Sequence, residues 1–129
     1  MLGDASDILA SVACMAGYLM DVPPHWYEPR SVMIIQGDSD YVVTYEAGSY
    51  WPGAEETIAE WAELNGCPTA TPNVTEYSGY NLHAIGCGDA PITLVQLLGV
   101  GHNPYWSECI TPAQPPPYDH HAIVACACY

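Results

Sequence analysis

The sequence of 129 residues contains no lysine, no phenylalanine and only one arginine, Arg30. Fifteen aspartates and glutamates oppose this single basic residue, and the formal net charge is −14. A protein with such a charge repels the phosphates of nucleic acids and the headgroups of anionic membranes. The composition therefore argues against nucleic acid and against membrane surfaces as partners.

Long hydrophobic runs are also absent. The longest apolar stretch, Ile8–Met20, is shorter than the roughly 20 residues that a helix needs to cross a bilayer, and Gly17 interrupts it. It is not typical of a signal peptide either, because Asp4 and Asp7 precede it where basic residues are expected. If the protein is secreted, we expect its signal to lie outside this sequence, which is a first indication that the chain is incomplete.

The sequence is rich in cysteine, with six in 129 residues, and half of its residues are apolar. Asn73-Val74-Thr75 is an acceptor sequence for N-glycosylation. Together these features predict a folded, secreted, disulfide-bonded protein in the extracellular space. Six cysteines permit fifteen complete pairings, and the sequence alone does not choose among them.

One helix is marked at both ends within residues 49–67. Pro52 suits its first turn, Glu55 and Glu56 complement the N-terminal dipole, and Gly66 suits the position just after its end. Apolar residues recur there at helical spacing, which predicts one buried face; they are Ala54, Ile58, Trp61 and Leu64.

Short apolar runs bounded by turn residues predict strands at 11–17, 32–36, 73–77 and 91–99. Strands that alternate with a helix and form continuous apolar runs favour a parallel α/β sheet. We expect one domain over residues 1–110, followed by a proline-rich, cysteine-bearing tail over residues 111–129.

Asp38 and Asp40 stand in a turn directly after the strand at 32–36, and His102 stands in a glycine-bounded loop after the strand at 91–99. A carboxylate that orients an imidazole, which then accepts a proton from a nucleophile, is the chemistry of the serine hydrolase triad. In α/β hydrolases the acid and the histidine follow late strands in this order. The simpler alternative is that both aspartates only cap a turn.

Five blocks of the sequence, in order, resemble the C-terminal half of secreted esterases in the family of polyhydroxybutyrate depolymerases and feruloyl or acetylxylan esterases. They are SDILASVACMAGYL, SVMIIQGDSDYVVTYEAG, AEETIAEWAELNGC, YSGYNLHAIGC and VQLLGVGHNPYW, within residues 5–107. Members typically show His-Gly-x-x-Asp after an apolar strand, a helix ending in Asn-Gly-Cys, and a Gly-Gly-His loop. Here Gln36 replaces the first histidine, and the loop is Gly99-Val100-Gly101-His102.

The resemblance implies part of an α/β-hydrolase sheet, incomplete relative to the full fold, with Asp40 as the triad acid and His102 as the base. It also implies a disulfide between Cys67 and Cys87, no cofactor, and ester substrates on polysaccharide or polyester. The remaining cysteines stay unassigned, although Cys126 and Cys128 are too close to bond to each other without strain; they are Cys14, Cys109, Cys126 and Cys128.

The serine of the triad is missing, because Gly-x-Ser-x-Gly occurs nowhere in the sequence. One hypothesis is therefore a fragment of a secreted serine esterase that is inactive alone. The alternative is a non-catalytic extracellular assembly protein, in which a second copy or a partner covers an open sheet edge near residues 11–17.

Two further sets of residues have weaker functional interpretations. Zinc binding at the histidines and cysteines of the tail matches no closed site, and we expect no metal there; these residues are His120, His121, Cys126 and Cys128. Aromatic residues either line the edge of an ester-glycan cleft or simply pack; they are Tyr45, Trp51, Trp61, Tyr105 and Trp106.

Overall fold

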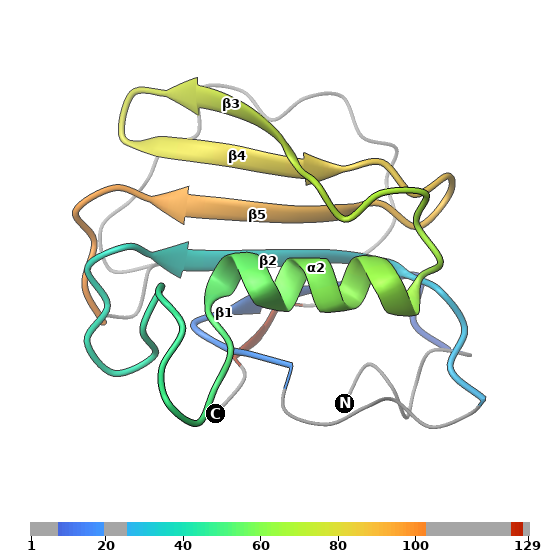
Figure 1. The fold of residues 1–129 in the computed structure, drawn as a ribbon, viewed down its shortest axis with the longest axis horizontal. Coiled ribbons are helices and arrows are strands. Elements are labelled where there is room, and N and C mark those ends of the chain that lie inside the picture. Colours follow the sequence, from blue (N-terminus) through green and yellow to red (C-terminus); the bar gives the residue numbers. More distant parts are fainter. Residues whose placement is uncertain (1–7, 20–25, 103–124, 128–129) are drawn as a thin grey trace.

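The computed structural model describes residues 8–19, 26–102 and 125–127. Within these ranges six strands and one helix follow one another along the chain (Figure 1). They are β1 (Ser11–Met15), β2 (Ser31–Gly37), α2 (Ala54–Leu64), β3 (Asn73–Tyr77), β4 (Tyr80–Ile85), β5 (Ile92–Leu97) and β6 (Ala125–Ala127). The protein therefore has the α/β character that the sequence predicts.

The strands form one mixed sheet in the order β3-β4-β5-β2-β1-β6. β1, β2, β5 and β6 pair in parallel, whereas β4 is antiparallel to both of its neighbours, β3 and β5. The expectation of a wholly parallel sheet is thus wrong at β3 and β4. The physical reason is the two-residue connection Ser78-Gly79, where the positive φ of 91° at Gly79 closes a hairpin and leaves no length for a crossover.

The edge of the sheet beside β1 is partly paired within the chain. β6 aligns with β1 in parallel, with Ala13 opposite Ala125 and Met15 opposite Ala127. Three residues of the predicted tail are therefore part of the sheet, and the rest of residues 111–129 lie outside the described ranges. The chain itself therefore covers part of the edge at 11–17. The expectation that a second copy or a partner covers this edge stays a prediction.

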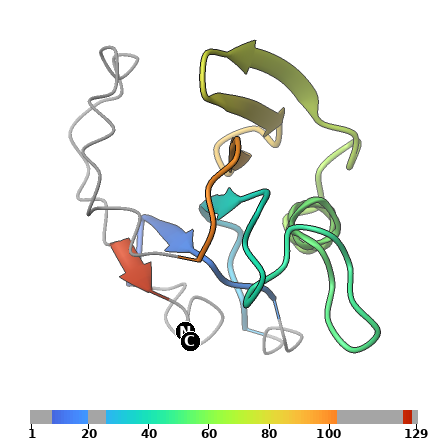
Figure 2. The same cartoon turned by 90° about the vertical axis from the view of Figure 1, so that its left-hand side faces the viewer.

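α2 forms where its capping residues predict and packs across one face of the sheet against β2 and β5 (Figures 1 and 2). Gly53 precedes the helix, and the Glu56 carboxylate accepts a hydrogen bond from the Gly53 N–H at 3.2 Å. Gly66 follows the end with φ of 66°, a left-handed conformation that glycine adopts without strain.

The hydrophobic core lies between α2 and the sheet. Ile58 from the helix meets alternate side chains of β2 and β5, and all of them are almost wholly buried; the strand residues are Val32, Ile34, Ile92 and Leu94. Because burial alternates along β2, only one face of this strand is fully enclosed among the described residues.

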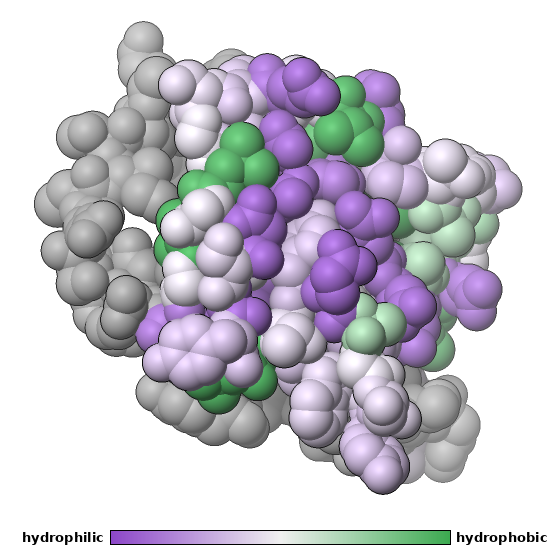
Figure 3. Space-filling model, turned by 60° about the vertical axis from the view of Figure 1, so that its left-hand side comes forward, coloured by the Kyte–Doolittle hydropathy of each residue, from purple (hydrophilic) through white to green (hydrophobic). Residues whose placement is uncertain are grey.

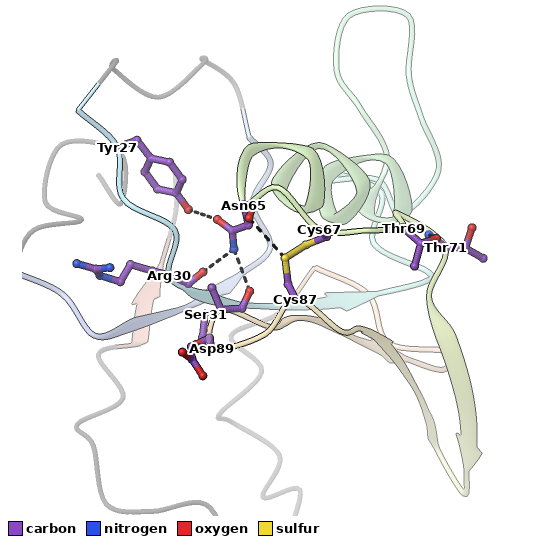
Figure 4. Close-up of a disulfide and its surroundings, with 10 residues drawn as sticks. Tyr27, Arg30, Ser31, Asn65, Cys67, Thr69, Thr71, Cys87 and Asp89 are labelled. Atoms are coloured by element: carbon purple, nitrogen blue, oxygen red, sulfur yellow. Dashed lines mark hydrogen bonds between the residues drawn. A yellow bond between two sulfur atoms is a disulfide. The ribbon is translucent and has the colours of Figure 1, made fainter.

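The Cys67–Cys87 disulfide joins the segment just after α2 to the loop between β4 and β5 (Figure 4). The resemblance to the esterases implied this pair, and the structure confirms it. Cys14 is disulfide-bonded as well. The pairing of the other cysteines lies outside the residues whose side chains are described.

The side chain of Asn65, at the end of α2, connects the helix to the starts of two strands (Figure 4). Its amide nitrogen donates to the carbonyls of Arg30 at 2.9 Å and Ala90 at 3.0 Å, which precede β2 and β5. Its carbonyl accepts a hydrogen bond from the Tyr27 hydroxyl at 2.6 Å. Burial raises the pKa of Tyr27, so this hydroxyl keeps its proton over the neutral range and remains a donor.

We expect Asn65→Ala to lower the free energy of unfolding by about 3 kcal/mol, because three hydrogen bonds are lost and two carbonyls lose a donor. Asn81→Ala is the matched control, since its amide makes one hydrogen bond, to Gln96, and should cost about 1 kcal/mol. Urea unfolding measures both values. Equal costs for the two variants would contradict the anchoring role of Asn65.

Candidate functional site

Asp40 occupies the turn after β2, and its carboxylate is fully enclosed. One oxygen, Oδ1, accepts the backbone N–H groups of Val42 and Val43, each at 2.9 Å. The other oxygen, Oδ2, accepts the amide of Gln36 at 3.3 Å. These donors stabilise the negative charge of a side chain that water does not reach.

His102 lies after β5 and is a further hydrogen-bond partner of Asp40. Its Nδ1 atom is 2.9 Å from Asp40 Oδ2, and its side chain is 34% exposed. Because an ionised carboxylate can only accept, Nδ1 carries the hydrogen of this bond. The second ring nitrogen, Nε2, is then left as the atom that can accept a proton when the imidazole is neutral.

Asp40 and His102 meet because the chain after β2 and the chain after β5 approach each other closely. A Cβ atom on Gly37 would lie 2.1 Å from the carbonyl oxygen of Val100, so only glycine fits at this position. The Ser39 N–H donates to that same carbonyl at 3.1 Å. The positions of the predicted acid and base are therefore fixed by main-chain contacts as well as by their own hydrogen bond.

Asp38 does more than cap the turn after β2, which is the role that the sequence suggests, because it also binds the loop after β5. Its Oδ1 atom accepts the backbone N–H of Gly99 at 2.7 Å and the Ser39 hydroxyl at 3.1 Å. Gly99 adopts a positive φ of 71° in the turn after β5. Asp38 thus links the acid-bearing loop to the loop that carries His102.

Gln36 is the residue of this site that sequence reasoning undervalued. It is 1% exposed, and its amide donates to Asp40 and to the carbonyl of Val43. Its side chain therefore supports both the carboxylate and the turn around it. The signal in the sequence was a polar amide at the end of an apolar strand, where burial requires hydrogen-bond partners.

The aromatic residues proposed for a cleft have different positions. Trp61 and Tyr45 are buried in the core, where burial and the nearby Glu55 carboxylate raise the pKa of Tyr45. Trp51 is partly exposed, stacks with Tyr18 and donates its indole N–H to Thr44 at 3.2 Å. Tyr105 and Trp106 lie outside the described residues, so Trp51 is the one candidate that the structure places at the surface.

The structure shows neither a nucleophile beside His102 nor a cluster of metal ligands within the ranges that it describes. No serine hydroxyl there forms a hydrogen bond with His102, and the hydroxyl of Ser39 instead donates to Asp38. No three histidine, cysteine or acidic side chains gather there in a way that could hold a metal. The tail residues considered for zinc, such as His120 and His121, lie outside these ranges.

In Figure 3 the end of the sheet at which β2 and β5 finish comes toward the viewer. Hydrophilic residues occupy the middle of this face, and hydrophobic residues form only small, separate groups. Among the described residues, no helix is both long enough and apolar enough to cross a bilayer.

Comparison with known proteins adds no assignment to this geometry. No protein-family model matches the chain, and the search of curated proteins finds no match.

We expect Asp40→Asn to remove the charge-assisted bond to His102, while Asp38→Asn keeps an oxygen that can accept the Gly99 N–H. The measurement is proton NMR of the His102 ring at low temperature. A strongly deshielded Nδ1 proton should be present in the parent and in Asp38→Asn and absent in Asp40→Asn. The same spectrum in all three proteins would show that the two side chains do not pair in solution.

We expect Gly37→Ala to cost about 2–3 kcal/mol of stability, because the new methyl group collides with the Val100 backbone. Gly86→Ala is the control, since a Cβ atom there has no neighbour within 4 Å. Thermal unfolding compares the two variants. A Gly37→Ala protein as stable as Gly86→Ala would contradict the close approach of the two loops.

Proposed function

We propose that the chain is the acid-and-base half of a secreted serine esterase. The observation that carries this proposal is the 2.9 Å bond between His102 Nδ1 and the enclosed carboxylate of Asp40. This is the relation that orients a catalytic imidazole in a serine hydrolase. The esterase-like sequence blocks that contain both residues support the same proposal.

In the proposed reaction, His102 Nε2 accepts the proton of a serine hydroxyl as the serine oxygen attacks the ester carbonyl. The ester C–O bond then breaks, and the proton passes from His102 to the departing alcohol. In the second half of the reaction, water attacks the acyl-serine with His102 again as base, and the acid and the free serine are released. Asp40 keeps the ring in the required tautomer and stabilises its charged form. The serine comes from a segment outside these 129 residues, since none of their serines has the Gly-x-Ser-x-Gly frame.

The proposed substrates are esters on neutral polysaccharide or polyester in the extracellular space. The net charge of −14 disfavours anionic polymers. The Cys67–Cys87 disulfide is compatible with an oxidising compartment.

The alternative function is that of a non-catalytic extracellular assembly protein. Two observations favour it: no serine bonds to His102 within the described ranges, and the edge of the sheet beside β1 is paired there with only three residues, those of β6. Under this alternative, Asp40 and His102 hold two loops together without performing chemistry.

To test the esterase proposal, the polypeptide that contains these residues is purified from its native source and treated with a fluorophosphonate probe. We expect one labelled serine in the same polypeptide, in a peptide outside residues 1–129. In the recombinant form of that polypeptide, His102→Ala should slow labelling at least about 100-fold, because the general base is lost. Asp38→Asn, whose side chain can still bind Gly99, should label at nearly the parent rate.

Absence of any labelled serine, together with an intact mass that matches the 129 residues with or without sugar, would overturn the esterase proposal. That result would favour the assembly protein.

A further inference from the structure

β3 is the outermost strand of the sheet, and all five of its residues are exposed (Figures 1 and 2). Among the described residues it pairs with β4 on one side only, in a continuous register from Asn73 opposite Ala84 to Tyr77 opposite Tyr80. An edge strand offers its free N–H and C=O groups to any other strand, including that of a second copy.

β3 has few of the devices that usually prevent such pairing. Its register contains no bulge, and its five residues include no proline and no lysine. Val74 and Tyr77 are each 47% exposed, and Glu76 supplies the only charge. The strand is therefore a site of potential self-association unless another group covers it.

The strand begins at Asn73, whose side chain is available for modification. Asn73 and Thr75 are both exposed and, two residues apart, project from the same face of the strand. The Asn73 amide makes no hydrogen bond to the described residues. In contrast, the amides of Asn65 and Asn81 are engaged with other groups of the protein.

We propose that Asn73 carries an N-linked glycan that covers the outer edge of β3 and prevents it from pairing with a second copy of the chain. In this modification the Asn73 amide nitrogen forms a bond to the anomeric carbon of a lipid-linked oligosaccharide diphosphate. The bond from that carbon to the diphosphate breaks, the lipid diphosphate leaves, and the amide nitrogen loses one proton.

The register shows how the glycan would be placed. Val74 lies opposite His83, which in turn lies opposite the core residue Leu94, so Val74 belongs to the face that α2 covers. Asn73 and Thr75 therefore project from the opposite face. A bulky hydrated group at the first residue of the strand, directed away from the helix, hinders the approach of a second strand without disturbing the core.

The glycan is tested by secreting the chain from a eukaryotic host and measuring its intact mass. We expect masses above 13.9 kDa that differ by sugar units and collapse after glycosidase treatment. Glycosidase in heavy-oxygen water should convert Asn73 to labelled aspartate. Asn73→Gln should abolish the added mass, while Thr75→Ser and Asn81→Gln should keep it; an unmodified parent chain would overturn the proposal.

The covering role is tested by sedimentation of the parent, of Asn73→Gln, and of Asn73→Gln combined with Val74→Lys. We expect the parent to stay monomeric and Asn73→Gln to self-associate. The added lysine on the exposed strand should restore the monomer. If Asn73→Gln is as monomeric as the glycosylated parent at every concentration, the covering role is wrong even when the glycan is present.

This inference shares with the proposed function only the expectation that the chain is secreted. The edge strand and the acceptor asparagine are the same in an esterase fragment and in an assembly protein. Fluorophosphonate labelling and glycan mass therefore succeed or fail separately.

Discussion

The enclosed carboxylate of Asp40 is the constraint on which one end of the molecule depends. A charge removed from water costs several kcal/mol unless hydrogen-bond donors surround it. The backbone of Val42 and Val43 supplies two donors and thereby shapes the turn after β2. His102 supplies another, which requires the loop after β5 to lie against that turn. This close approach in turn requires glycine at position 37.

The opposite ends of the same two strands are held by a neutral group. Asn65 binds the carbonyls that precede β2 and β5, and the Cys67–Cys87 disulfide adds a covalent link nearby. The two strands that carry Asp40 and His102 are thus fixed at both ends, with α2 packed between the anchors. Such a rigid frame is what a catalytic pair needs, and it would equally suit a protein that assembles through the sheet edge beside β1.

Local signals predicted α2 and its limits well, because Gly66 and the acidic first turn act within a few residues of the helix ends. β4 was harder to predict. One face of this strand is mixed, since Asn81 and His83 share it with Ile85 and form hydrogen bonds with Gln96 on the neighbouring strand. A glycine such as Gly79 indicates a turn, but that alone does not predict that the next segment returns antiparallel. β6 has three residues, too few for a periodic pattern.

The sequence by itself determined the charge, the helix and the order in which an acid and a histidine follow two apolar strands. These depend on residue type and short spacing, which are visible along a linear chain. Only the tertiary structure decided that Asp40 and His102 touch, that Gln36 and Asp38 support them, and that the hairpin makes the sheet mixed. Each of these contacts depends on which strands become neighbours. Strand order reflects the packing of the whole core, and no short segment of sequence contains it.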